Sequence, residues 1–296
     1  MGVTLRYFSA YGLGINSEIE IPEFQSAKDG SDIQIRLENE KYQSLLGIDK
    51  QPYWRINRRE AVLSFENVGT FHILEGQKIA NIPAPNGDPR VIRQYIIGTA
   101  LAIVLYQRGC LILHASSVMI GASAIALLGI PGSGKSSIAA ALNTLGYDVI
   151  TDDVAVIDTK SDTPSIFSGH HQIRLRSETA EVLGYNVDEK SSQLDIYGKY
   201  SYQISNRLPQ APVPLAQIYS ISEGQQTLIT RLPSQSAVID LILHSIPTRW
   251  SLPDEEQHFA QCIDIAKRIP LFSLQRSSKV SELPELAKLI VANIAA

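Results

Sequence analysis

The stretch LLGIPGSGKSSIAAALNTLGYDVITDDVAVID, Leu127–Asp158, decides the fold class of this chain. An apolar run leads into a glycine-rich loop, a helical segment begins near Lys135, and Gly146 stands where that helix would end. The apolar run that follows, residues 147–158, alternates little, which is typical of a strand covered on both faces of a sheet. The order strand, loop, helix and strand predicts an α/β protein in which helices flank a sheet.

The loop itself matches the pattern G-x-x-x-x-G-K-[ST] of phosphate-binding loops. Glycines let the backbone N–H groups close around phosphate oxygens, and the N-terminus of the following helix adds its positive dipole. Lys135 supplies a positive charge to the β and γ phosphates, and the Ser136 hydroxyl can ligate Mg²⁺. The flanking strand and helix are those the motif requires, so the sequence predicts a nucleotide site. Its expected residues are Gly129, Ile130, Pro131, Gly132, Ser133, Gly134, Lys135, Ser136 and Ser137.

An acidic pair, Asp152 and Asp153, comes near the end of the strand that follows the helix. Ligands of open α/β sheets bind at the carboxyl ends of strands, so these side chains should lie beside the loop. Successive strand residues point to opposite faces, so the two carboxylates can take different tasks. One can hold Mg²⁺ and the other can accept a proton from an incoming hydroxyl. A solvated turn is the alternative, and many nucleotide hydrolases carry one Asp here, so the pair alone does not decide for a kinase.

His114, in the run LILHASS before the loop, has two interpretations. A lone histidine among aliphatic residues is usually part of a core. Two antiparallel strands would instead carry it back beside the phosphates, where it could donate to the γ-phosphate or tune an aspartate. Arg174, Lys199 and Arg207 are candidate phosphate or substrate contacts. Surface charge is the commoner explanation for Arg174, whereas Lys199 and Arg207 lie in a stretch rich in Gly, Tyr and Ser that could close over the site as a loop.

The composition of the chain excludes some classes of binding partner. The chain has 296 residues, 44% of them hydrophobic, and a net charge of −4, so it lacks the basic footprint of a nucleic-acid binder. Two cysteines make no disulfide framework, and the first residues lack the pattern of a signal peptide, so we expect a cytoplasmic protein. The most apolar segment, residues 95–106, is too short to span a membrane, so no membrane partner is expected. A homo-oligomer remains compatible with the sequence.

Two domains are expected. Residues 1–87 consist mostly of short runs rich in aromatic and β-branched residues, which predicts a β-rich domain. The segment IPAPNGDP, residues 82–89, is the best candidate for a boundary. Residues 88–296 would then begin with a helix that Asp88 caps and Gly109 ends.

His114, the loop and the acidic pair, with the spacing between them, resemble the catalytic domain of bacterial HPr serine kinase/phosphorylase. The chain is more closely similar to the HPr-kinase-like proteins of lasso-peptide biosynthetic clusters, which phosphorylate a serine at the C-terminus of the precursor peptide. This second resemblance covers most of the chain. It rests on YGLGINSEIEIPEF, VIRQYIIGTALAIVLYQRGCLILHASSV, IRLRSETAEVLGY, PLAQIYSIS, RLPSQSAVIDLILH and IPLFSLQRSSKVSELPEL.

The resemblance implies an HPr-kinase-like P-loop kinase core and a role for each matching residue. Asp153 would accept the proton of the substrate hydroxyl, Asp152 and Ser136 would serve Mg²⁺, Lys135 the β and γ phosphates, and His114 the surroundings of the γ-phosphate. The glycine-rich segment that marks true HPr kinases after the acidic pair is replaced here by IFSGHHQIRLRSETAEVLGY, so the resemblance does not extend to HPr as the substrate.

The expected activity is therefore ATP- and Mg²⁺-dependent phosphorylation of a serine in a peptide or protein, with a lasso precursor peptide as first candidate. The N-terminal domain is expected to grip that substrate. Two alternatives stay open, namely a kinase acting on an amino acid or another small molecule, and an ATP-dependent switch without a phospho-acceptor. ATP is favoured over GTP because the chain has no Asn-Lys-x-Asp motif.

Overall fold

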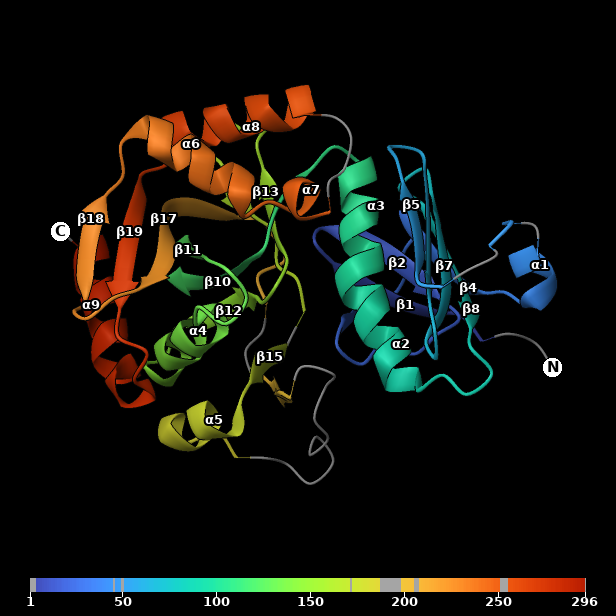
Figure 1. Ribbon diagram of the computed structural model, residues 1–296, viewed down its shortest axis with the longest axis horizontal. Coiled ribbons are helices and arrows are strands. Elements are labelled where there is room, and N and C mark those ends of the chain that lie inside the picture. Colours follow the sequence, from blue (N-terminus) through green and yellow to red (C-terminus); the bar gives the residue numbers. More distant parts are fainter. Residues whose placement is uncertain are drawn as a thin grey trace. The chain divides into compact units, whose positions relative to one another are not determined.

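The computed structural model describes residues 4–44, 46–48, 51–170, 172–186, 198–204, 208–250 and 255–295. The chain forms two compact units, Met1–Cys110 and Leu111–Ala296. Both contain a large sheet, and Figure 1 shows helices packed against each. The predicted mixed α/β class and the β-rich N-terminal region are confirmed.

The first unit is built on an eight-stranded sheet with the order β3-β1-β2-β4-β8-β7-β6-β5. Pairing is antiparallel except between β2 and β4 and between β4 and β8. Its elements are β1 (Arg6–Ala10), β2 (Leu13–Ser17), β3 (Gln25–Ser26), β4 (Ile33–Leu37), α1 (Glu40–Ser44), β5 (Tyr53–Ile56), β6 (Glu60–Phe65), β7 (Gly69–Leu74) and β8 (Lys78–Pro83).

A helical segment that the sequence assigned to the second domain belongs to this first unit. Asp88 caps it as predicted, and the ring of Tyr95 stacks on Phe71 of β7, with centroids 5.9 Å apart. The division of the chain therefore follows Cys110 and not residue 87, because an apolar helix packs on this sheet. The proline-rich segment at 82–89 is a turn inside the unit. The helical elements are α2 (Pro89–Tyr95), η1 (Ile96–Ala100), one π-helical stretch, and α3 (Leu101–Gln107).

The second unit has a sheet with the strand order β12-β10-β11-β17-β14-β13-β9, and β19 also pairs with β17. Strand β17 runs parallel to both β11 and β19. The strands are β9 (Leu111–Leu113), β10 (Ala115–Ile120), β11 (Ser123–Leu128), β12 (Asp148–Thr151), β13 (Ala155–Asp158), β14 (Ser165–Ile166), β17 (Val213–Glu223), β18 (Leu228–Arg231) and β19 (Leu271–Arg276). A separate pair consists of β15 (Gln172–Leu175) and β16 (Tyr200–Gln203).

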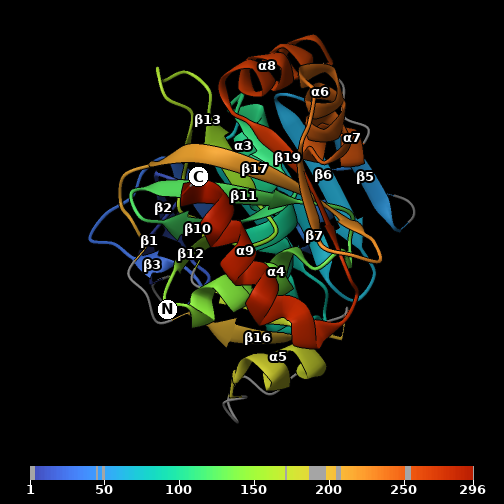
Figure 2. The same ribbon diagram turned by 90° about the vertical axis from the view of Figure 1, so that its left-hand side faces the viewer.

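Helices cover both faces of this sheet, as Figures 1 and 2 show. Alternate residues of β11 enter two different cores, as expected when both faces of a strand are buried. Ile125 and Leu127 pack with α4 and α9, whereas Ala126 and Leu128 pack with α6 and α8. The helical elements are α4 (Lys135–Thr144), α5 (Ser177–Leu183), α6 (Ser234–Leu243), α7 (Ile246–Arg249), α8 (Glu255–Arg268), η2 (Val280–Glu282) and α9 (Leu283–Ala295).

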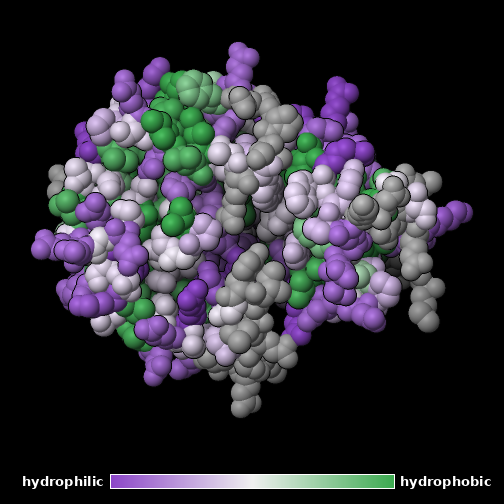
Figure 3. Space-filling view, in the orientation of Figure 1, coloured by the Kyte–Doolittle hydropathy of each residue, from purple (hydrophilic) through white to green (hydrophobic). Residues whose placement is uncertain are grey.

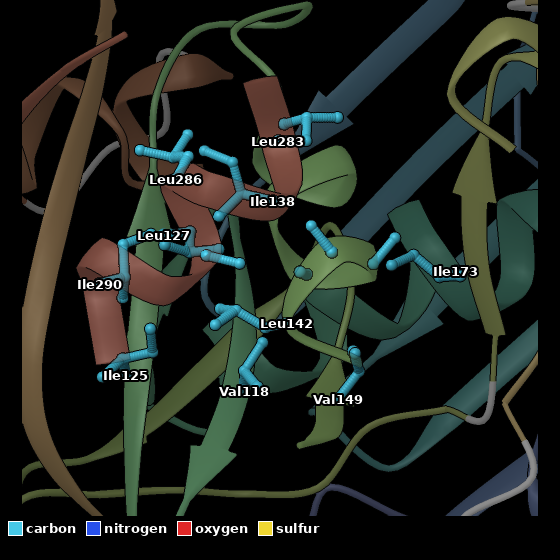
Figure 4. Close-up of a cluster of buried hydrophobic side chains, with 14 of the residues drawn as sticks. Val118, Ile125, Leu127, Ile138, Leu142, Val149, Ile173, Leu283, Leu286 and Ile290 are labelled. Carbon is cyan, nitrogen blue, oxygen red and sulfur yellow. The ribbon is translucent and has the colours of Figure 1, made fainter. Parts of the chain in front are cut away.

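The core beneath α9 gives a direct test of this packing. Figure 4 shows Ile290 of α9 among the side chains of that core. Ile290 is fully buried, so Ile290→Ala is expected to lower the free energy of unfolding by about 2–5 kcal/mol. Leu289, its neighbour on the same helix, is 50% exposed, and Leu289→Ala should change that energy by no more than about 0.5 kcal/mol. Urea unfolding of both variants checks the pair, and equal losses would contradict the assignment of the buried face.

Two predicted strands are interrupted, and the interruptions face each other. The run 147–158 was expected to form one strand, but it forms β12 and β13 with residues 152–154 between them. The run LILHASSVMI is likewise divided at His114 into β9 and β10. Leu113 pairs with Ala155 and Ser117 pairs with Thr151, so the two gaps lie opposite one another. Such irregular points in a ladder are frequent next to functional sites.

The order of the strands also differs from the simplest expectation. Strand β12 pairs with β10 and not with β11, so β10 lies between the loop strand and the strand of the acidic pair. Because β10 is antiparallel to both neighbours, β11 and β12 still run in the same direction. Their carboxyl ends therefore reach the same edge of the sheet, as the prediction required.

The outer side of α6 is apolar and exposed. Ile239 and Leu243 on this helix are each 59% exposed. Figure 3 shows apolar surface over α6, at the upper left of the view. None of the helices in the described ranges combines the length and the hydropathy needed to cross a membrane.

Candidate functional site

The site residues meet at one edge of the sheet in the second unit. The loop 129–134 leaves the carboxyl end of β11, and the acidic pair leaves the carboxyl end of β12. Between them lies the beginning of β10, with His114 directly before it. Sheet topology thus brings together three segments that are far apart in the chain.

The loop is shaped as a cradle for an anion. Gly132 and Gly134 have φ values of 87° and 101°, which glycine adopts readily. Lys135 and Ser136 open helix α4 and are buried, and Ser137 follows them in its first turn. The Lys135 ammonium donates to the carbonyl oxygens of Gly129 at 2.7 Å and Ile130 at 3.1 Å, so it lies folded over the loop.

One further observation indicates that the cradle fits a phosphate. The hydroxyl oxygen of Ser133 is buried and has no hydrogen-bond partner among the described residues. A buried polar group without a partner is costly unless a ligand satisfies it. The predicted residues Gly129, Ile130, Pro131, Gly132, Ser133, Gly134, Lys135, Ser136 and Ser137 therefore form one continuous loop and helix start suited to a phosphate chain.

Asp152 is the buried acceptor at the centre of the site. Its Oδ1 accepts hydrogen bonds from the hydroxyls of Ser136 at 2.9 Å and Ser116 at 2.5 Å. Its Oδ2 accepts from the backbone N–H of Arg174 at 3.3 Å, and only 1% of the residue is exposed. The carboxylate and the Ser136 hydroxyl thus form a hard oxygen pair directly beside the loop.

The carboxylate of Asp152 and the hydroxyl of Ser136 are oxygen ligands of the kind that Mg²⁺ takes. Within the described ranges, no three His, Cys, Asp or Glu side chains gather in a way that could hold a metal ion. Mg²⁺ is usually held by one or two carboxylates together with substrate phosphates, and not by an all-protein cage. Ser136 and Asp152 fit that pattern.

Asp153 points elsewhere and has other partners. Its φ of 70° lies in the left-handed region, which turns the backbone out of the strand direction. Its carboxylate forms an ion pair with the Arg174 guanidinium, and its carbonyl oxygen accepts a hydrogen bond from His114 Nδ1 at 2.9 Å. Because a carbonyl oxygen can only accept, Nδ1 of His114 carries the proton. The two carboxylates thus have separate surroundings, as their different tasks would need.

The three predicted basic residues have different outcomes. Arg174, on β15, lies at the site, where its guanidinium is paired with Asp153. Lys199 directly precedes Tyr200 of β16, and Tyr200 pairs with Leu175 of β15. Arg207 lies outside the described residues. The catalytic and binding roles of all the predicted site residues stay predictions.

Three residues at this edge were not identified from the sequence as site residues. Ser116 binds Asp152, as described above. His244 follows α6, and its carbonyl oxygen accepts from the backbone N–H of His114 at 2.8 Å. Burial lowers the pKa of His244. The negative charge of Asp240 acts to raise this pKa, and the positive charge of Lys135 acts to lower it further. Arg276 ends β19 beside Gly134. No local motif marks these residues, because strand order alone brings them here.

Because Arg276 lies close to the loop, we expect alanine substitutions at Gly134 and at Gly132 to lower the free energy of unfolding by different amounts. Gly134→Ala and Gly132→Ala should each cost about 1–2 kcal/mol of unfolding free energy, because both positions have left-handed φ values. A β-carbon at Gly134 would also collide with Nη1 of Arg276, whereas one at Gly132 meets nothing within 4 Å. We therefore expect Gly134→Ala to cost about 0.5–1.5 kcal/mol more than Gly132→Ala, the cost of displacing the end of one flexible side chain from its preferred rotamer. Urea unfolding of the nucleotide-free variants measures this difference, and equal costs would show that the guanidinium moves aside freely.

Comparison with known proteins gives a distant likeness to solved structures. No protein-family model matches the chain, and no curated protein matches it. Among solved structures, the HPr(Ser) kinase/phosphatase from Coxiella burnetii matches with 14% identity and a TM-score of 0.33. The match covers 62% of this chain and 94% of that one. It is a distant likeness to the fold of a kinase/phosphatase and leaves the substrate open.

Proposed function

We propose that this protein is an ATP- and Mg²⁺-dependent kinase that transfers the γ-phosphoryl group to a serine hydroxyl of a peptide or protein. The observation that carries the proposal is that the two residues of the acidic pair have different partners. Asp152 is bound to the P-loop residue Ser136, whereas Asp153 is turned away from it and held by other partners. A carboxylate held apart from the metal site is what a kinase needs to accept the proton of an incoming hydroxyl.

Nucleotide binding would rest on the loop and on the start of α4. Backbone N–H groups of the loop would hold the phosphates, and Lys135 would exchange its bonds to the Gly129 and Ile130 carbonyls for phosphate oxygens. Ser136 and Asp152 would hold Mg²⁺, which when bound neutralises charge on the phosphate chain. The Ser133 hydroxyl would gain the partner it lacks among the described residues.

Transfer would need a base beside the γ-phosphate. The serine oxygen forms a bond to the γ-phosphorus while the bond from phosphorus to the β–γ bridging oxygen breaks, so that ADP leaves with that electron pair. The serine proton goes to the carboxylate of Asp153. Arg174 holds this carboxylate through an ion pair, and His114 holds the backbone of the same residue, so that the base keeps one orientation.

The proposed acceptor is a serine in a peptide, and a lasso precursor peptide that ends in serine is the first candidate. Support comes from the resemblance of stretches such as YGLGINSEIEIPEF and RLPSQSAVIDLILH to the kinases of lasso-peptide clusters. The N-terminal unit is the proposed substrate-gripping part, in keeping with the expectation from the sequence.

The test is an incubation of the full chain with ATP, Mg²⁺ and a panel of acceptors, followed by mass spectrometry. The panel holds peptides with a C-terminal serine, the same peptides with alanine in its place, and free serine. A gain of one phosphoryl group on the serine peptides alone supports the proposal. Phosphorylation of free serine alone would establish a small-molecule kinase, and release of inorganic phosphate without any phosphorylated acceptor would establish an ATPase switch. Either result would overturn the proposal.

A further inference from the structure

Arg276 is a buried arginine at the same sheet edge as the loop. It is the last residue of β19, and only 8% of it is exposed. Strand β19 is parallel to β17, and β17 is parallel to β11, so all three carboxyl ends reach this edge. The guanidinium therefore lies on the β17 side of the loop, whereas Asp152 lies on the β10 side.

The charge of Arg276 has no close counter-ion in the described part of the chain. Its Nε donates to the carbonyl oxygen of Ser277 at 2.6 Å, and the two terminal nitrogens make no hydrogen bond to a described residue. Glu223 and Glu282 act on it only from beyond ion-pair distance. Burial lowers the pKa of Arg276 in spite of these carboxylates, which agrees with incomplete compensation of its charge. Charged side chains are rarely buried without a partner.

The guanidinium is aimed at the loop. A β-carbon built on Gly134 would collide with Nη1 and lie 3.4 Å from Cζ, so the group packs against the α-carbon of this glycine. Gly134 is the N-cap of α4, where backbone N–H groups already favour an anion. A buried cation without a close partner and a helix N-terminus thus converge on one point.

We propose that Arg276 binds the phosphate chain of the nucleotide on its α/β side, as a second cation beside Lys135. The proposal rests on the proposed function, because it names a further binding residue of the same site. Lys135 serves the β and γ phosphates in loops of this kind, whereas the backbone of the loop cradles the α and β phosphates. The planar guanidinium can donate two parallel hydrogen bonds to one phosphate group. The ligand class is a nucleoside diphosphate or triphosphate, and the γ-phosphate is not needed for the contact.

The experiment is isothermal titration of the full chain with ADP and with Mg²⁺-ATP. Arg276→Met should weaken both ligands alike, by about 10- to 100-fold, because it removes charge-assisted hydrogen bonds made in both complexes. Arg276→Lys should recover part of the loss, since it keeps the charge without the fork. Arg231→Met is the matched control, because Arg231 is an exposed arginine at the end of the adjacent strand β18, and it should bind like the wild type.

Stability separates this role from a structural one. Arg276→Met removes a buried charge without a close counter-ion, so the nucleotide-free protein should unfold at the same or a higher urea concentration. A lower urea midpoint together with unchanged ADP affinity would mean that Arg276 only anchors the end of β19, and that would overturn the proposal. If Arg276→Met does not fold, the nucleotide affinity of Arg276→Lys is the deciding measurement. An unchanged affinity in that variant would contradict the two parallel hydrogen bonds proposed for the guanidinium. Wild-type protein that binds no nucleotide would refute the proposed function itself, whereas equal binding by the wild type and Arg276→Met refutes only this inference.

Discussion

Asp153→Asn is expected to lower the rate of phosphoryl transfer by about 100- to 10,000-fold, the usual contribution of a positioned general base. The amide cannot accept the serine proton, yet it is close in shape to the carboxylate. Its loss also frees Arg174 from an ion pair, without touching the loop or Asp152. Affinity for Mg²⁺-ATP should therefore stay close to that of the wild type, so the defect should appear in the catalytic rate constant.

Asp148→Asn is the matched control for this variant. Asp148 begins β12, the strand that ends directly before the acidic pair, and it lies at the opposite end from the site. Transfer to a serine peptide, followed by mass spectrometry with titration calorimetry in parallel, measures both quantities. An Asp153→Asn protein with full transfer activity would remove Asp153 as the base.

Lys135→Met should lower kcat/KM by about 100- to 1,000-fold, the cost typical of losing one preorganised donor to a developing charge. The ammonium is buried and bonded to the Gly129 and Ile130 carbonyls in the free protein, so the side chain is already at the mouth of the loop. Methionine keeps most of its length and packing. The loss should appear both in ATP affinity and in the rate constant, because Lys135 serves the leaving phosphates as well as the transferred group.

Lys288→Met provides the comparison, since Lys288 is an exposed lysine of α9. Steady-state kinetics over a range of ATP concentrations separates kcat from KM. Urea unfolding should show the Lys135→Met protein folded, with a stability no lower than that of the wild type by more than about 1 kcal/mol, because the substitution removes a buried charge. Retained kcat/KM in Lys135→Met would contradict the placement of the triphosphate in this loop.

Much of the fold was predictable because local signals agreed with one another. The glycine-rich loop, the helix from Lys135 and the stop at Gly146 each carry a pattern that depends only on neighbouring residues. The interruption at residues 152–154 has no such local sequence pattern. Its run of apolar residues is compatible with one long strand, and only the pairing of β12 with β10 and of β13 with β9 divides it.

The same limit applies to the candidate site. Ser136 and the acidic pair were identifiable as neighbours, because a strand, a helix and a strand in succession bring their ends to one edge. Arg276 was not identifiable, since its place depends on β19 adding to the sheet beside β17 at the far end of the chain. Ser116 gave no signal either, because a serine in an apolar strand is as common in cores as in sites. The first domain boundary was misplaced for a related reason, since an apolar helix does not reveal which sheet it will cover.

The facing gaps at His114 and at residues 152–154 limit how the sequence of this chain can evolve. Leu113 pairs with Ala155 on one side of the gaps and Ser117 with Thr151 on the other, so both strands cross the opening with the same number of residues. An insertion or deletion of one residue in either strand would break that equality and turn the side chains beyond it to the opposite face of the sheet. The length of the two segments is therefore constrained apart from the identity of their residues. Homologous chains should keep both segments at constant length.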